Sequence, residues 1–203
     1  MVKTFYKRIT IAATGLLLCA CEMKNPFSEI PLLSSFRSES SIDVLGGWGK
    51  VRGPSKYCVS DDVSRPETGF VVFVPCYFTS KSESKPATEG LIMIQVGTEG
   101  SAIVTDKKEE ILSYLKSDEG LNTLTGKRGL SAIGGQINNN IVEILLEEGL
   151  STNASGFHPH EWRAFFDLND RLVTIAIRSF ANHPNSDTEA LELLRVATSR
   201  VIN

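Results

Sequence analysis

EWRAFFDLNDRLVTIAIRSF, residues 161–180, is the stretch that decides the fold. Apolar residues occupy alternate positions in 161–168 and again in 171–180. A period of two puts such side chains on one face of a strand. Asn169 and Asp170, between the two parts, tolerate the positive φ angles of a two-residue turn. The stretch therefore predicts an antiparallel β-hairpin with one buried face.

Further strands are predicted upstream, where β-branched and aromatic residues are concentrated, at 50–52, 57–60, 70–74, 91–96 and 141–146. The polar stretch 134–140, GGQINNN, predicts a turn. Capping boxes at 106–109 and 186–189 predict the starts of two main helices, with a further helical turn near 121–124. This order favours an α+β fold, an antiparallel β-sheet with two main helices packed against it.

The chain begins with the features of an export signal. Lys3, Lys7 and Arg8 precede a short apolar run at 9–18. A helix that crosses a bilayer needs about 20 apolar residues. The run is shorter than that, so it is expected to direct export rather than to span the membrane.

Leu18, Cys19, Ala20 and Cys21 end this segment in the order of a lipobox. The segment resembles the signal of bacterial lipoproteins, in which a Leu and a small residue precede the Cys that becomes the acylated N-terminus. The resemblance implies cleavage before Cys21 and attachment through lipid chains, each buried methylene contributing about 0.8 kcal/mol. The alternatives are modification of Cys19, secretion with cleavage after an Ala, and an uncleaved anchor.

The expected organisation is a lipoprotein signal peptide at 1–20, a lipidated N-terminus and flexible tether at 21–44, and a single α+β domain at 45–203. Residues 22–44 mix serines with prolines without periodicity, as flexible linkers do. Removal of the signal takes away three basic residues and leaves 18 basic against 24 acidic residues, a net charge of −6. Such a chain lacks the basic surface that nucleic-acid binding requires, so no nucleic-acid partner is expected.

The cysteines indicate one disulfide. With Cys19 in the signal and Cys21 acylated, Cys58 and Cys76 remain in the domain. The oxidising compartment favours their pairing, which would stabilise the fold by about 3 kcal/mol. A reactive or metal-binding thiol pair is the alternative, but the two residues have no CxxC spacing and no nearby His.

The histidines are the only candidates for a metal site. On an extended strand His158 and His160 would face the same way, and His183 lies near the far end of the partner strand. Zinc sites use three or four such ligands. Solvent-facing loop histidines are the favoured interpretation, so no metal and no cofactor is expected. Asp167 and Asp170, beside the hairpin turn, are expected to be solubilising rather than catalytic.

A compact pattern surrounds the cysteine pair: Gly53-Pro54, Tyr57-Cys58, Ser64-Arg65, the strand 69–72 and Cys76. It resembles that of a group of small alphaproteobacterial envelope proteins of unknown activity, which implies an exported protein with a paired Cys motif. The residues themselves indicate a loop at 59–75 held at both ends by the disulfide, with Arg65 anchored through Asp61 or Asp62. A ligand-presenting loop is the alternative.

No set of residues in the chain forms a recognisable catalytic motif. The sequence therefore predicts a lipid-anchored protein of the cell envelope, exposed to the periplasm, whose domain is a non-enzymatic binding module. Its expected partners are the membrane, through the N-terminal lipid, and an envelope protein. The alternative is a metal-dependent hydrolase or other enzyme that uses the region of His158, His160 and His183.

Overall fold

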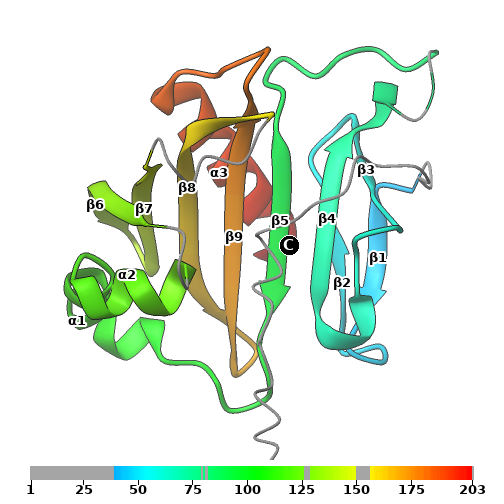
Figure 1. Cartoon of the computed structure of the whole chain (residues 1–203). Coiled ribbons are helices and arrows are strands. Elements are labelled where there is room, and N and C mark those ends of the chain that lie inside the picture. The colour runs from blue at the N-terminus through cyan, green and yellow to red at the C-terminus, as the bar shows by residue number, and fades with distance from the viewer. Residues whose placement is uncertain (1–38, 79, 81, 126–128, 150–155, 203) are drawn as a thin grey trace, which may run out of the picture.

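The computed structural model describes residues 39–78, 80, 82–125, 129–149 and 156–202 (Figure 1). Its centre is a seven-stranded antiparallel sheet in the order β3-β4-β5-β9-β8-β7-β6. These strands are β3 (Tyr57–Val59), β4 (Phe70–Pro75), β5 (Leu91–Val96), β6 (Leu130–Asn138), β7 (Ile141–Glu148), β8 (Phe157–Leu168) and β9 (Arg171–Phe180). A separate hairpin pairs β1 (Ser41–Val44) with β2 (Gly49–Arg52). The helices are α1 (Val104–Leu115), α2 (Asp118–Thr125) and α3 (Asp187–Ile202). The structure therefore confirms the predicted α+β class with an antiparallel sheet.

The hairpin of β8 and β9 forms in the predicted register. Leu168 pairs with Arg171, and Asn169 and Asp170 take φ angles of 48° and 62° in the turn. Trp162 lies opposite Ile177, and both are buried. The predicted alternation therefore describes the buried face of this hairpin.

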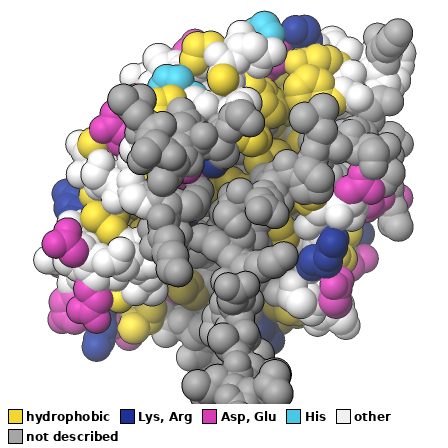
Figure 2. Space-filling model, viewed as in Figure 1, with side chains coloured by type: hydrophobic (Ala, Val, Ile, Leu, Met, Phe, Trp, Pro, Cys, Tyr) yellow, Lys and Arg dark blue, Asp and Glu magenta, His cyan; other side chains and the backbone are white. Residues whose placement is uncertain are grey.

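Helices lie on both faces of the sheet (Figure 1). On one face α3 packs against β8 and β9 and also contacts β2, and Arg195 of α3 donates two hydrogen bonds to the buried carboxylate of Glu143 in β7. On the other face α1 contacts β6, β7 and β8, while α2 contacts α1 and β6. Figure 2, from the same side as Figure 1, shows acidic side chains gathered over α1 and α2.

Three clusters of buried residues fill these layers. The largest lies between α3, the β1–β2 hairpin and the sheet, and includes Leu194, Val51 and Phe166. The second lies between α1, α2 and strands β6–β8. The third contains only residues outside the helices, with Val63 and Phe157 packed against it, and its buried members are Phe70, Val72, Val74, Leu91, Met93 and Ala176.

Of the two predicted capping boxes, the one at α3 forms and the one at α1 does not. At α3 the box forms, because Ser186 Oγ accepts a hydrogen bond from the N–H of Glu189, whose carboxylate accepts one from the N–H of Ser186. At α1 the prediction is wrong, since the helix begins at Val104 and not after Asp106. The carboxylate of Asp167, from β8, accepts hydrogen bonds from the N–H groups of Ile103 and Thr105, at 2.9 and 2.7 Å. A residue distant in sequence thus supplies the cap.

Two boundaries also differ from the prediction. The sequence predicts a turn over 134–140, but β6 extends to Asn138 and the turn is confined to Asn139 and Asn140. The polar, glycine-containing strand lies at the sheet edge and carries a bulge between Ala132 and Gly134, so it lacks the apolar alternation that predicts a strand. The sequence also predicts a tether over 21–44, but β1 occupies Ser41–Val44.

The predicted signal peptide and Cys21 lie outside the described residues. Within the described ranges, no helix is long and apolar enough to cross a membrane.

Candidate functional site

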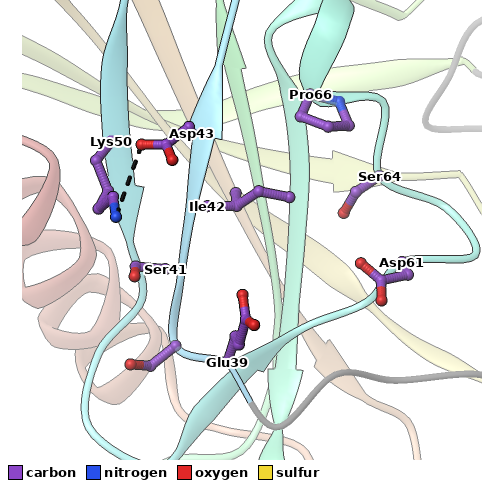
Figure 3. A pocket seen from close by; sticks show the side chains of 9 residues that line it. Glu39, Ser41, Ile42, Asp43, Lys50, Asp61, Ser64 and Pro66 are labelled. Carbon is purple, nitrogen blue, oxygen red and sulfur yellow. Dashed lines mark ion pairs between the residues drawn. The ribbon is translucent and has the colours of Figure 1, made fainter. Parts of the chain in front are cut away.

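The clearest pocket opens between β1 and the loop that follows β3 (Figure 3). It has a volume of about 850 Å³. Its lining residues are mainly polar or acidic: Glu39, Ser40, Ser41, Ile42, Asp43, Lys50, Asp61, Ser64 and Pro66. In Figure 3 the side chains of Glu39, Ile42 and Asp61 point into the space between the strand and the loop. The pocket is therefore built by the N-terminal edge of the domain and the disulfide-closed loop.

The disulfide fixes the base of this loop. Cys58 in β3 and Cys76, directly after β4, are bonded, with their Cα atoms 4.9 Å apart, which confirms the predicted pair. Both residues are buried. Because β3 has only three residues, the covalent bond secures a short edge strand that few ladder hydrogen bonds hold.

Backbone contacts set the shape of the loop. Arg65 and Phe70 exchange two backbone hydrogen bonds, and the buried Ser64 hydroxyl accepts the N–H of Val72. Gly69 takes a φ of 79°, and a Cβ there would lie 2.5 Å from the carbonyl oxygen of Val96. The Arg65 guanidinium donates to the carbonyl oxygens of Asp62 and Ser64. The predicted Arg65 anchor therefore includes the carbonyl group of Asp62.

Two further backbone bonds join the loop and β3 to the first described strand. The N–H of Leu45 donates to the carbonyl of Pro66, and the N–H of Val59 donates to the carbonyl of Glu39, each at 2.9 Å. These bonds hold the two walls of the pocket in register. The pocket is accordingly a preformed feature of the fold.

The pocket is lined by more negatively charged side chains than positively charged ones. Glu39, Asp43 and Asp61 provide three carboxylates, whereas Lys50 provides one ammonium group. Lys50 Nζ lies 3.7 Å from Asp43 Oδ1, and both side chains are largely exposed, so this ion pair contributes little to stability. The excess of carboxylates, with serine hydroxyls beside them, makes the pocket suited to a cationic group of a ligand.

The histidines occupy two different environments. His158 and His160 lie half-buried in β8, with ring centroids 4.9 Å apart, so the prediction that they are solvent-facing loop residues is wrong. His183 is exposed in the turn after β9, as predicted. Figure 2 shows histidine side chains at the upper end of the molecule, where β8 begins. Desolvation, followed by the neighbouring His160, lowers the pKa of His158.

Both ring nitrogens of His160 face carboxylates. Nδ1 lies 2.8 Å from Asp187 and Nε2 lies 3.6 Å from Glu147. These contacts connect β8 to β7 and to the first turn of α3. Within the described part of the chain, no group of three or more His, Cys, Asp or Glu residues is arranged to hold a metal ion. The alternative of a metal-dependent enzyme stays a prediction.

A buried ionic network, which the sequence did not predict, crosses β7, β8 and β9. Arg163 donates to Glu161, Arg178 donates to Glu148, and Arg178 Nε lies 3.6 Å from Glu161. Each of these side chains is at most 3% exposed. Arg163 also donates to the carbonyl of Leu124 in α2. Removing one partner from such a network costs about 3–5 kcal/mol because a charge stays buried.

The signal that could have revealed this network is the spacing of its members. Glu161 and Arg163 alternate with the apolar residues of β8, which indicates a solvent-facing side when the hairpin is considered alone. The helices α1 and α2 lie over that side of the sheet, but nothing in residues 161–180 shows that cover. The two aspartates beside the turn are structural too, since Asp167 caps α1 and Asp170 accepts the N–H of Gly100.

Comparisons with known proteins give a likeness to solved structures alone. No family model and no curated protein matches the chain. Among solved structures, a point mutant of protein Mog1 aligns with a TM-score of 0.46 and 15% sequence identity, over 83% of this chain and 94% of that chain.

Proposed function

We propose that this chain is a lipid-anchored, non-enzymatic binding protein of the bacterial cell envelope, with its domain exposed to the periplasm. The sequence Leu18-Cys19-Ala20-Cys21 after a basic start and an apolar run supports the lipid anchor. The disulfide between Cys58 and Cys76 suits an oxidising compartment.

The acidic pocket is the proposed binding site, and the observation that carries this choice is that the side chains of Glu39 and Asp61 point into a preformed opening, while Asp43 at its edge faces Lys50. Its expected ligand is a basic segment of an envelope protein. A Lys or Arg side chain would enter between β1 and the loop, where carboxylates can accept charge-assisted hydrogen bonds. Opposite charge at the rim would also accelerate the encounter at low ionic strength.

Capture of envelope proteins by chemical cross-linking tests this proposal. The full-length protein is expressed in cells, cross-linked, and recovered with any bound protein. Glu39→Gln together with Asp61→Asn is expected to reduce capture of the main partner severalfold, because the substitution removes two charges and keeps the side-chain shapes. Glu67→Gln is the matched control, since Glu67 is an exposed acid of the same loop that does not line the pocket.

Capture should also fall as salt is raised, because screening weakens attraction between exposed charges. The proposal would lose its support if the wild-type protein captured no envelope protein. It would also be contradicted if the pocket variant and the Glu67→Gln control captured the partner equally well.

A further inference from the structure

One edge of β1 presents backbone hydrogen-bonding groups to the acidic pocket. On its other edge β1 pairs with β2, and the N–H of Gly53 continues that ladder by donating to the carbonyl of Ser40 at 2.8 Å. In an antiparallel ladder, the N–H and C=O groups of every second residue point to the same neighbouring strand. The groups of Ser40 and Ile42 therefore point to β2. Those of Ser41 and Asp43 point the opposite way.

The hydrogen bonds on either side of this stretch follow the same alternation. The carbonyl of Glu39 and the N–H of Leu45 bond to β3 and to the loop, not to β2. Between them, the outward groups of Ser41 and Asp43 have no backbone partner among the residues that the structure describes. Both residues line the pocket, whose other wall is the loop (Figure 3). Unpaired N–H and C=O groups along a strand edge are a template for another extended chain.

We propose that the pocket takes an extended basic peptide, which binds as an added β-strand along residues 41–43. This inference rests on the proposed function, since it assumes that a basic segment of an envelope protein enters the pocket. Strand addition gives affinity through main-chain hydrogen bonds and specificity through alternate side chains. The free stretch lies between the bonds of Glu39 and Leu45 and is about 10 Å long, so it pairs with about three residues of the ligand.

The side chains of β1 indicate the order of residues in the ligand. A period of two places Ser41 and Asp43 on one face of the strand and Ile42 on the other. Side chains directly opposite in neighbouring strands share a face, and opposite charges there stabilise the pairing. Residues beside Ser41 and Asp43 would thus be basic, with Glu39 and Asp61 supplying further carboxylates in the pocket. The residue beside Ile42 would be apolar, so the ligand is expected to be basic, apolar and basic in turn.

The backbone groups of β1 favour a peptide over a small organic cation of the same charge. Ser41 and Asp43 each present one donor and one acceptor, and residues two apart in a strand are about 7 Å apart. An extended peptide presents its own donors and acceptors at the same spacing, so it can bond to both residues at once. A polyamine can contact the carboxylates of the pocket, but it has no carbonyl group to accept from the outward N–H groups.

Binding of a synthetic peptide to the full chain, purified in detergent, tests the proposal. The probe is fluorescently labelled Lys-Val-Lys-Val-Lys with a C-terminal amide, and fluorescence anisotropy measures its affinity. Two modified probes keep every charge and carry backbone N-methyl groups either on both valines or on the second and third lysines. Only one of these alternating sets of N–H groups can face β1, so the two modified probes should differ in affinity about tenfold. Spermidine, with a similar positive charge and no peptide bond, should bind severalfold more weakly than the probe.

A pair of substitutions tests the same hydrogen bonds from the side of the protein. Ser41→Pro removes the N–H that points to the pocket, whereas Ser41→Ala removes the hydroxyl and keeps that N–H. Proline is tolerated at the first residue of a strand, and this N–H does not point to β2. The probe should bind severalfold more weakly to Ser41→Pro than to Ser41→Ala. Circular dichroism checks that both variants keep the fold.

The outcomes separate the added strand from the acidic pocket itself. Equal affinities of the two methylated probes, equal binding to Ser41→Pro and Ser41→Ala, or spermidine binding as tight as that of the probe would each overturn the added strand. The pocket would still stand as the binding site if Glu39→Gln with Asp61→Asn weakened binding of the unmodified probe. If the wild-type chain did not bind the probe at all, both the added strand and a basic ligand in this pocket would be contradicted.

Discussion

Two halves of the same sheet face are closed in different ways. Over β6–β8, the helices α1 and α2 supply the opposing apolar side chains, and Asp167 ties the start of α1 to the sheet. Over β4, β5 and β9, the described helices supply none, although the side chains of Val72 and Met93 are as buried as those of the other half. The two halves therefore differ in what packs against them: α1 and α2 cover β6–β8, whereas residues outside the helices, Val63 and Phe157 among them, pack against β4, β5 and β9.

The edges of the two halves differ as well. The outer strand of the helix-covered half is β6, which runs from Leu130 to Asn138. Beside β4, the outer strand is β3, which spans only three residues and is secured by the bond between Cys58 and Cys76. The disulfide therefore lies at the edge of the sheet that neither a long ladder of hydrogen bonds nor a described helix supports.

The largest expected effect compares one buried residue from each half. Ile144→Ala, in β7, and Met93→Ala, in β5, each remove a large side chain that is at most 1% exposed. If both halves are closed to water, each substitution should lower the free energy of unfolding by about 3 kcal/mol, the usual cost of emptying a core position. Urea denaturation of the full chain, followed by circular dichroism, measures both values.

If Met93→Ala lowers the free energy of unfolding much less than Ile144→Ala does, the expectation that both halves are closed to water is wrong. It would mean that water reaches the cluster on β4, β5 and β9, since truncation of an exposed methionine costs little free energy. The effects of the two substitutions should also be nearly additive in the double variant, because the residues belong to different clusters.

A smaller effect is expected at the cap of α1. Asp167→Ala should lower the free energy of unfolding by about 1 kcal/mol, because it removes the acceptor for the N–H groups of Ile103 and Thr105. Asp106→Ala is the control, since Asp106 occupies the position that the sequence pattern favours as the cap. Its substitution should change stability by less than about 0.5 kcal/mol. Equal losses from the two variants would contradict the assigned cap.

This contribution should depend on pH. Partial desolvation raises the pKa of Asp167, but the backbone N–H groups of Thr105, Val104 and Ile103 outweigh it and hold that pKa below its ordinary value. A carboxyl group with a lowered folded-state pKa contributes stability above its unfolded pKa of about 3.9, and this stability is lost as pH falls through the folded value. The difference between wild type and Asp167→Ala should therefore be constant near pH 7 and shrink in acid.

Local signals were enough to predict much of the fold. The alternation in 161–180, the continuous run at 70–74 and the capping box at Ser186 all depend on neighbours in the sequence. Strand β6 and the start of α1 could not be predicted in that way. Strand β6 is polar and bulged at the sheet edge, and α1 is capped by Asp167 from a strand more than sixty residues away.

The site was less predictable than the fold. The cysteine count and the oxidising compartment are enough to predict the bond between Cys58 and Cys76, whereas a ligand-presenting loop between them is only the alternative to a structural loop. Its second wall, with Glu39 and Asp43, falls in the stretch that the sequence presents as a tether. The buried pairing of Glu161 with Arg163 was also missed, because alternation alone assigns both residues to a solvent-facing side.

The proposed acylation of Cys21 underlies the proposed place of this protein at the membrane. Metabolic labelling with a fatty acid, followed by membrane fractionation, compares the wild-type chain with Cys21→Ser, and Cys19→Ser serves as the control. Wild type and Cys19→Ser are predicted to carry the label and to remain with the membranes, whereas Cys21→Ser should be unlabelled and released. Unchanged membrane retention of Cys21→Ser, or absence of label from the wild-type chain, would contradict the account.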